Sequence, residues 1–192
     1  MLLIAMTQQR VEAALAAGEL ACPACSGPLS PWGFARSRVV RTPTEIQSVR
    51  PRRARCQACR ITHVLSPSWL VPRRRDSAHV IGQALGLAAA GNGHRPIAQQ
   101  LHRPQSTVRG WLRTARARAE SLRACATRRL VALDADVAAV IPTASSLGDA
   151  VEAIMLAVRA WVLRFGPDNV SPWERAVWLT GGLLHGCLAL PP

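Results

Sequence analysis

The sequence predicts a mainly α-helical chain with one small β unit: an N-terminal zinc ribbon, a three-helix domain and a C-terminal helical hairpin. Three observations predict this fold class. Two Cys-x-x-Cys pairs lie near the N-terminus, separated by thirty residues. Short runs of Arg and Val between the pairs, bounded by Pro and Gly, are typical of strands and turns. Apolar residues then recur at helical spacing through much of the remaining chain.

Changes in composition divide the chain into five segments. We expect an N-terminal helix in residues 1–20, the ribbon in 21–66, a basic linker in 67–76, the three-helix domain in 77–129 and a helical C-terminal region in 130–192. A length of 192 residues is enough for one or two small domains.

The basic charge lies in the middle of the chain. The net charge is +13, every basic residue is Arg, and residues 22–130 hold 20 of the 24 arginines against Glu45, Asp76 and Glu120. Such a segment favours a polyanion as partner, and nucleic acid rather than a membrane because no wide apolar face accompanies the charge. No stretch has the length of a membrane span or the pattern of an export signal, so we expect a cytoplasmic protein.

The cysteine pairs, Cys22 with Cys25 and Cys56 with Cys59, predict a structural zinc site. Each pair places two thiolates on one tight turn, and two such turns complete a tetrahedral ligand set. About forty residues with few large apolar side chains also need the folding energy of a metal. Disulfides and a redox dithiol are the alternatives, but neither an oxidising compartment nor a strand-helix context is indicated. We interpret His63 as a strand residue with a surface hydrogen bond.

The linker and the ribbon supply arginines suited to phosphate. We expect Arg52 and Arg53 of the ribbon, and Arg73, Arg74 and Arg75 of the linker, to contact a nucleic-acid backbone without reading its sequence. Asp76 is expected to cap a helix over 77–90.

Residues 92–120 predict a helix-turn-helix. A short helix over 95–101 is followed by a corner at His102 and Arg103, and a second helix begins at Pro104. One apolar stripe of this second helix continues to Leu122. A neighbouring face presents amide, hydroxyl and guanidinium groups, those of Gln105, Ser106, Arg109, Arg113 and Arg116. Gln suits adenine and Arg suits guanine in the major groove, so we expect contact with double-stranded DNA. The alternative is an ordinary solvated face.

The C-terminal region predicts two further helices. Ser146 with Asp149, and Ser171 with Glu174, have the spacing of capping boxes, and the helices after them are expected over 147–165 and 172–185. A helical hairpin cannot bury both apolar stripes alone. It must therefore pack on the rest of the chain or form a homodimer through residues 147–185.

Both basic modules resemble parts of known proteins. IAQQLHRPQSTVRGWL is similar to the helix-turn-helix of bacterial transposases and regulators, with His102 in place of the usual Gly and Pro104 in place of the usual Ser. The cysteine ribbon resembles the N-terminal zinc-binding domain of insertion-sequence transposases, with Arg60 in place of a Gly. Together they resemble the DNA-binding half of those enzymes, and also uncharacterised actinobacterial proteins with the same two modules.

The leading hypothesis is a zinc-stabilised DNA-binding protein of the nucleoid, either a transcriptional regulator or a stand-alone relative of a transposase DNA-binding half. A complete transposase would need three carboxylates gathered by a strand-rich fold to hold metal ions. The acidic residues after position 130 lie instead in helical, capping or loop sequence, so we do not expect an enzyme. An RNA-binding or protein-binding ribbon is the third hypothesis. RNA recognition favours exposed aromatic residues, and Trp32 is the one candidate in the ribbon.

Overall fold

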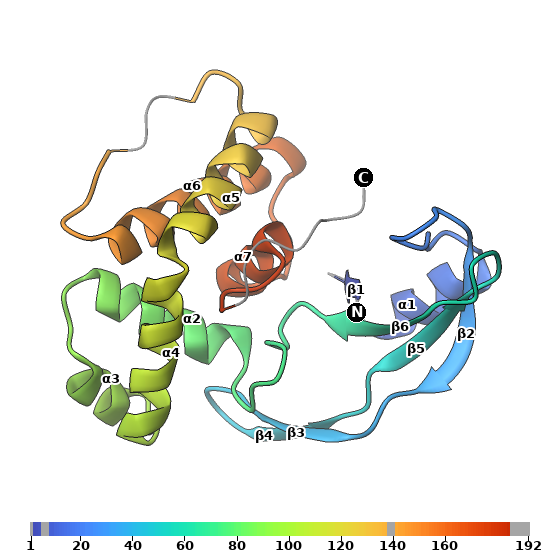
Figure 1. Cartoon of the computed structure of the whole chain (residues 1–192), viewed down its shortest axis with the longest axis horizontal. Coiled ribbons are helices and arrows are strands. Elements are labelled where there is room, and N and C mark those ends of the chain that lie inside the picture. The colour runs from blue at the N-terminus through green and yellow to red at the C-terminus, as the bar shows by residue number, and fades with distance from the viewer. Residues whose placement is uncertain (1, 5–7, 138–140, 185–192) are drawn as a thin grey trace.

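Helices and strands are segregated in the computed structural model, which describes residues 2–4, 8–137 and 141–184 (Figure 1). A β unit lies on one side and a helical body on the other. The strands of the described residues are β1 (Leu2–Ile4), β2 (Leu29–Phe34), β3 (Arg38–Arg41), β4 (Ile46–Val49), β5 (Arg52–Cys56) and β6 (Thr62–Pro67). The helices are α1 (Gln8–Ala16), α2 (Ala78–Ala89), α3 (His94–Gln100), α4 (Gln105–Ala117), α5 (Ala119–Leu133), α6 (Ser146–Phe165) and α7 (Pro172–Thr180). The mainly helical fold class with a small β unit is confirmed.

The larger sheet has the order β1-β6-β5-β2. β5 pairs antiparallel with both β2 and β6, while β1 pairs with β6 in parallel. The sequence analysis did not predict β1. A three-residue strand whose partner lies some sixty residues away, with Leu2 opposite Leu65, leaves no local pattern in the sequence.

One face of this sheet is covered by α1. Val11 and Leu15 of the helix pack with Leu29, Ala54 and Leu65 from the strands, and all five are buried. Because side chains alternate across a strand, the residues between them point to the other face. The sheet therefore has one covered face and one open face.

A second hairpin, β3–β4, extends from the sheet toward the helical body (Figure 1). Its base is joined to the sheet region by a hydrogen bond from Ala35 N–H to the carbonyl of Pro51, at 2.8 Å. Near its tip, the Arg41 N–H donates to Arg75 O and the Ser77 N–H donates to Arg41 O. The hairpin thus bridges the sheet and the start of α2.

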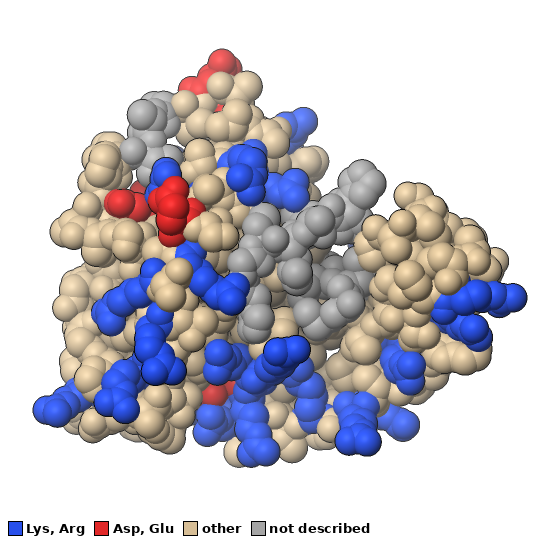
Figure 2. All heavy atoms as spheres, viewed as in Figure 1, with Lys and Arg blue, Asp and Glu red and all other residues tan. Residues whose placement is uncertain are grey.

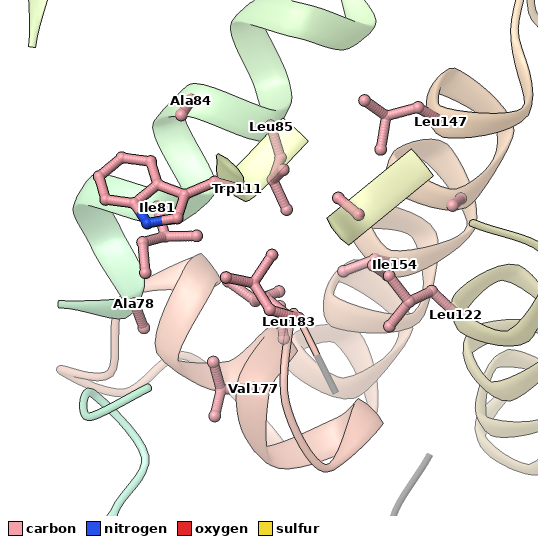
Figure 3. Close-up of a cluster of buried hydrophobic side chains, with 14 of the residues drawn as sticks. Ala78, Ile81, Ala84, Leu85, Trp111, Leu122, Leu147, Ile154, Val177 and Leu183 are labelled. Atoms are coloured by element: carbon pink, nitrogen blue, oxygen red, sulfur yellow. The ribbon is translucent and has the colours of Figure 1, made fainter. Parts of the chain in front are cut away.

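The core of the helical body joins all of its longer helices (Figure 3). Ile81 and Leu85 of α2 lie near Trp111 of α4, while Leu122 of α5 and Ile154 of α6 extend the same cluster. All five side chains are at most 1% exposed. The apolar periodicity of the sequence thus predicted these five core positions, but it wrongly placed Phe165 of α6 in the core, where it is 58% exposed.

The second basic helix is shorter than the sequence predicted. The stripe that was expected to continue to Leu122 is divided between α4 and α5 at Arg118, whose φ of −119° and ψ of 7° leave helical geometry. Val108, Trp111 and Leu112 are buried from α4, and Leu122 is buried from α5. The apolar spacing continues across this break, and neither Pro nor Gly stands at Arg118. The sequence pattern therefore did not indicate that the helix is interrupted there.

Three helix ends differ from the predicted caps. Ser77, not Asp76, caps α2 by accepting from Val80 N–H, and Ser145, not Ser146, caps α6 by accepting from Gly148 N–H. α7 has the predicted Ser171 cap but ends at Thr180, where Gly181 turns the chain with a φ of 73°. The predicted continuation of this helix to residue 185 is therefore wrong, since residues 181–184 are not helical.

The C-terminal hairpin packs on the same chain. α6 lies against α5, and α7 lies against α2 and α6. Gly82 of α2 permits this approach, because a Cβ at that position would come within 2.1 Å of the Trp173 ring. The buried face of α6 is formed largely by small residues, including Ala150, Ala153 and Ala157. Within the described residues, no helix combines the length and apolar character that crossing a membrane requires.

Candidate functional site

Two loops of matching geometry present the four cysteines. The Cys22 N–H donates to Gly27 O at 2.8 Å, and the Cys56 N–H donates to Ile61 O at 2.9 Å, so each loop closes over six residues. The residue after the second cysteine has a positive φ in both loops, 57° at Ser26 and 64° at Arg60. This conformation favours Gly, so Ser26 and Arg60 both adopt a φ that is unfavourable for a residue with a Cβ. The loops thus turn sharply enough to aim both thiols of a pair at one point.

The four sulfur atoms gather as a tetrahedral metal site requires. All lie within 4.8 Å of one another, with 3.7 Å between Sγ of Cys22 and Cys59 and 3.5 Å between Sγ of Cys25 and Cys56. Metal–sulfur bonds of about 2.3 Å in a tetrahedron place sulfur atoms about 3.8 Å apart. The donor set and its spacing therefore fit a metal ion held by four thiolates.

Backbone donors prepare part of this site for thiolates. Burial alone raises the pKa of Cys56, but the N–H of Cys59, the Cys25 side chain and the N–H of Ala58 outweigh it and lower the pKa to about 6. At Cys59 the N–H of Ile61 lowers the pKa, but burial and the three neighbouring sulfurs raise it to about 12. Four thiolates without a cation repel one another, so the pKa values separate.

Two further residues complete the surroundings of the sulfurs. His63 is buried, and its Nε2 lies 3.3 Å from Cys22 Sγ, so the predicted surface hydrogen bond is wrong. Its place on the α1-covered face of β6 follows from the strand register, in which His63 is opposite the buried Ala54. Gly27 is needed because a Cβ there would lie 2.9 Å from the Ala58 Cβ and 3.2 Å from Cys56 Sγ. The two cysteine loops therefore pack directly on each other.

The exposed face of α4 is the second candidate site. Its predicted polar residues are all exposed: Gln105, Ser106, Arg109, Arg113 and Arg116. Val108, Trp111 and Leu112 on the adjoining face are buried in the core. No acidic residue lies between Arg95 and Glu120, and within the described residues no ion pair engages the three arginines of this face. Their charge is therefore available to a partner.

A tight corner fixes α4 relative to α3. His102 has a φ of 50°, and the Arg103 N–H donates to Ala98 O at 2.9 Å. Pro104 precedes α4 without a side-chain cap. The side chains of Arg95, Gln99, His102 and Gln105 line an open hollow of about 530 Å³ beside this corner.

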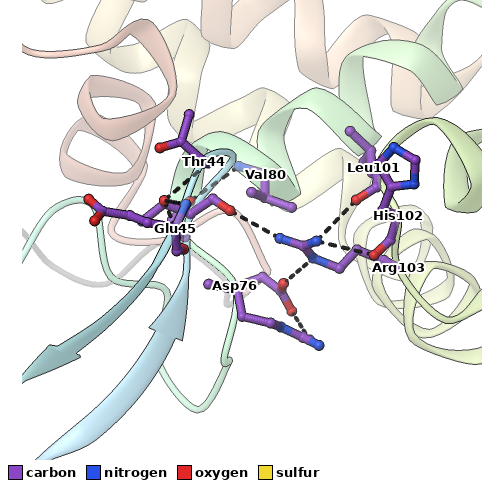
Figure 4. Close-up of polar contacts among 10 residues, drawn as sticks. Thr44, Glu45, Asp76, Val80, Leu101, His102 and Arg103 are labelled. Carbon is purple, nitrogen blue, oxygen red and sulfur yellow. Dashed lines mark hydrogen bonds and ion pairs between the residues drawn. The ribbon is translucent and has the colours of Figure 1, made fainter.

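A clamp that was not predicted from the sequence ties this corner to the β unit (Figure 4). Asp76 is 2% exposed, and its Oδ1 and Oδ2 accept from Arg103 Nε at 2.6 Å and from Arg41 at 2.7 Å. Arg103 also donates to Thr42 O at 3.1 Å. One carboxylate thus joins β3, the linker and the corner before α4. The signal was present in the sequence, since Asp76 is the one acidic residue between Glu45 and Glu120.

The remaining predicted arginines have different surroundings. Arg73 and Arg75 are exposed, while Arg74 is half-buried. Arg53 lies on the open face of the sheet, opposite Val64. Arg52 lies on the covered face, where it pairs with Glu12 at 2.9 Å and donates to Gly33 O at 2.7 Å. Arg52 therefore has a role in joining α1 to the sheet.

Comparison with known proteins gives one finding. A family model described as a domain of unknown function, DUF6431, matches residues 22–111. No curated protein and no solved structure matches the chain. The matched segment begins at the first cysteine of the cluster and ends inside α4, so it spans the cysteine loops, the clamp and the first half of the basic helix.

Proposed function

We propose that this chain is a zinc-stabilised protein that binds duplex DNA, with α3, the corner at His102 and α4 acting as a helix-turn-helix. The main observation in support is that α4 buries its apolar face in the core and exposes an adjoining polar face whose arginines form no ion pair within the described residues. A transcriptional regulator and a stand-alone relative of a transposase DNA-binding half are both proteins of this kind, and both act at the nucleoid.

The geometry of α4 supports insertion into the major groove. The groove is about 12 Å wide, enough for one α-helix with its side chains. Gln105, Ser106 and Arg109 lie in the first turns of α4, where recognition helices contact base edges. Arg113 and Arg116 continue the same face toward the phosphates. Bidentate contacts from Arg109 to guanine and from Gln105 to adenine would supply the base preference.

We propose zinc as the ion of the cysteine cluster and a structural role for it. Four thiolates and no open position are typical of structural zinc sites, whereas catalytic sites keep a position for water. The β unit has a core of only seven residues that includes Cys22 and Cys56. Metal binding would therefore contribute much of the folding energy of this unit.

Exposed arginines near α4 would add affinity through phosphate contacts. Figure 2 shows arginine side chains over α4, over the β3–β4 region and over the far part of the β unit on one view of the molecule. Arg73, Arg75 and the half-buried Arg74 belong to this proposed set, while the half-buried Arg53, on the open face of the sheet, would contact phosphate outside the segment that α4 binds. Arg52 is left out because Glu12 neutralises it on the covered face of the sheet.

Two other functions have less support. In a transposase, three carboxylates would gather around metal ions. Among the described residues, the cysteine set is the one group of three or more metal-ligand side chains. Asp168 pairs with Arg175, and Asp149 accepts from Thr143 N–H. For RNA binding, the ribbon offers two exposed aromatic residues, Trp32 and Phe34. This function would be favoured if the protein bound single-stranded nucleic acid more tightly than duplex.

The test is a selection in which zinc-loaded protein binds a pool of randomised duplexes and the recovered DNA is sequenced. We expect an enriched motif, which Arg109→Ala relaxes at one or two positions with a loss of roughly tenfold or more in affinity. Arg159→Ala is the matched control, since it removes the same charge from an exposed position of α6. Unchanged affinity and preference in Arg109→Ala would show that α4 is not the recognition helix. An enriched inverted repeat would in addition support the proposed homodimer.

A further inference from the structure

The open face of the larger sheet is a basic surface that the helix-turn-helix does not use. Register and alternation place Ser30 of β2, Arg53 and Arg55 of β5, and Thr62 and Val64 of β6 on this face. The register of β2 shifts after Pro31, and Trp32 is placed on the same face by its contact with Arg55. β2, β5 and β6 contain no Asp or Glu. Trp32 is 48% exposed, and the other five residues are half-buried, so this surface is accessible to solvent.

Trp32 and Arg55 form one ordered unit on this face. The Arg55 guanidinium lies over the Trp32 ring, with Cζ 4.6 Å from the ring centroid, and Arg55 Nε donates to Arg60 O at 3.2 Å. Both side chains are therefore held before a partner arrives, which reduces the entropy lost on binding. A flat ring beside a fixed guanidinium suits a sugar-phosphate backbone, since the ring packs on the sugar and the guanidinium pairs with a phosphate.

The sheet is connected to the helix-turn-helix through structured segments. β2 leads into β3 and β4 leads back into β5, so the β3–β4 hairpin is an extension of the sheet (Figure 1). The Asp76 clamp holds the hairpin at the corner before α4 through Arg41 and Arg103 (Figure 4). The position of the open face relative to α4 is thus set by hydrogen bonds and ion pairs.

We propose that the open sheet face, through Trp32, Arg53 and Arg55, contacts a second segment of the same duplex that α4 binds. This inference rests on the proposed function and extends it, because the DNA site becomes bipartite. The charge of the face favours a polyanion, and the clamp presents it at a fixed distance from α4. Its contacts add affinity without base preference.

The experiment compares two duplexes from the selected pool, one of about 30 base pairs and its central segment of about 12 base pairs, little more than one helical turn. Wild type should bind the long duplex at least tenfold more tightly. The Arg53→Ala/Arg55→Ala variant should lose most of this gain and match wild type within about twofold on the short duplex. It should also lower the slope of log affinity against log salt on the long duplex by about 2, or about 0.9 for each phosphate contact removed.

Three controls make the result decisive. Trp32→Ala should reproduce part of the long-duplex loss without the change in salt slope. Arg159→Ala should behave as wild type on both lengths, and cobalt absorption of each variant should show an intact four-thiolate site. Equal affinity of wild type for both lengths, or an equal loss on both in the Arg53/Arg55 variant, overturns the proposal. An Arg109→Ala/Arg113→Ala variant that retains wild-type affinity on both duplexes instead overturns the role of α4, separately from the length effect.

Discussion

His102 stands at the corner between α3 and α4 in a conformation that costs energy for any residue with a Cβ. Its φ of 50° lies in the left-handed region, where a non-glycine residue is less stable by about 1–2 kcal/mol. The His102 side chain is exposed, so burial in the core does not offset this cost. The local conformation is therefore maintained by the helices on either side of it.

His102→Gly should stabilise the protein. We expect a gain of about 1 kcal/mol in the free energy of unfolding, or roughly 2–4 °C in the midpoint of thermal unfolding, because Gly adopts this φ without steric cost. Differential scanning calorimetry of the zinc-loaded protein gives the measurement. His102→Ala is the matched control and should show no gain, since Ala retains the Cβ. Equal stabilisation by both variants would mean that the imidazole, and not the backbone, is the source of the cost.

Among the elements, the β3–β4 hairpin depends most on a single residue. Asp76 is almost fully enclosed, and its carboxylate is the shared acceptor of Arg41 and Arg103. The side chain of Arg103 is 13% exposed, so removal of the negative charge leaves a largely buried cation without its partner. Loss of one member of such a group costs more than the intact group contributes.

Asp76→Asn should therefore destabilise the chain by about 3 kcal/mol, measured by urea denaturation. It should also increase hydrogen exchange at the amides of Arg41 and Ser77, which bond the hairpin to the linker. Glu120→Gln is the control, because the Glu120–Arg123 pair lies at the surface of one helix, and it should change stability very little. If the two variants lose the same small amount, Asp76 does not clamp the hairpin.

The same elements show which parts of the fold could be predicted from the sequence. Cysteine spacing predicted the metal cluster, and apolar periodicity predicted α2, α4, α6 and α7, because both signals are local. The Asp76 clamp joins residues 41, 76 and 103, and β1 pairs with a strand some sixty residues away. Which residues meet over such distances depends on the final packing of the chain, and local residue spacing does not predict it. The burial of His63 was missed for a related reason, since its face is set by the pairing register of β5 and β6.

At the scale of the whole molecule, the described residues form two separate cores. One extends from Val71 through all helices from α2 to α7, and the other lies between α1 and the larger sheet. The second core has seven residues, two of which, Cys22 and Cys56, belong to the cysteine cluster. Small β units with so little buried apolar surface rarely remain folded without a metal or a disulfide. The two cores should consequently differ in their response to loss of the metal.

Removal of zinc should unfold the β unit and leave the helical body folded. With a chelator in excess, we expect release of one zinc per chain, most of the helical circular dichroism retained, and protease cleavage within residues 21–66 that leaves a resistant C-terminal fragment. Cys25→Ser/Cys59→Ser should give the same cleavage pattern without chelator. Arg159→Ala should remain resistant until zinc is removed.

If the helical body unfolded together with the β unit, the result would test the role of the Asp76 clamp. Loss of the entire helical signal at the chelator concentration that releases zinc would mean that the two cores unfold as one unit. Since the Asp76 clamp is a buried polar connection between them, Asp76→Asn should then separate the two transitions. Persistence of a single transition in that variant would assign the coupling to α7 and the linker instead.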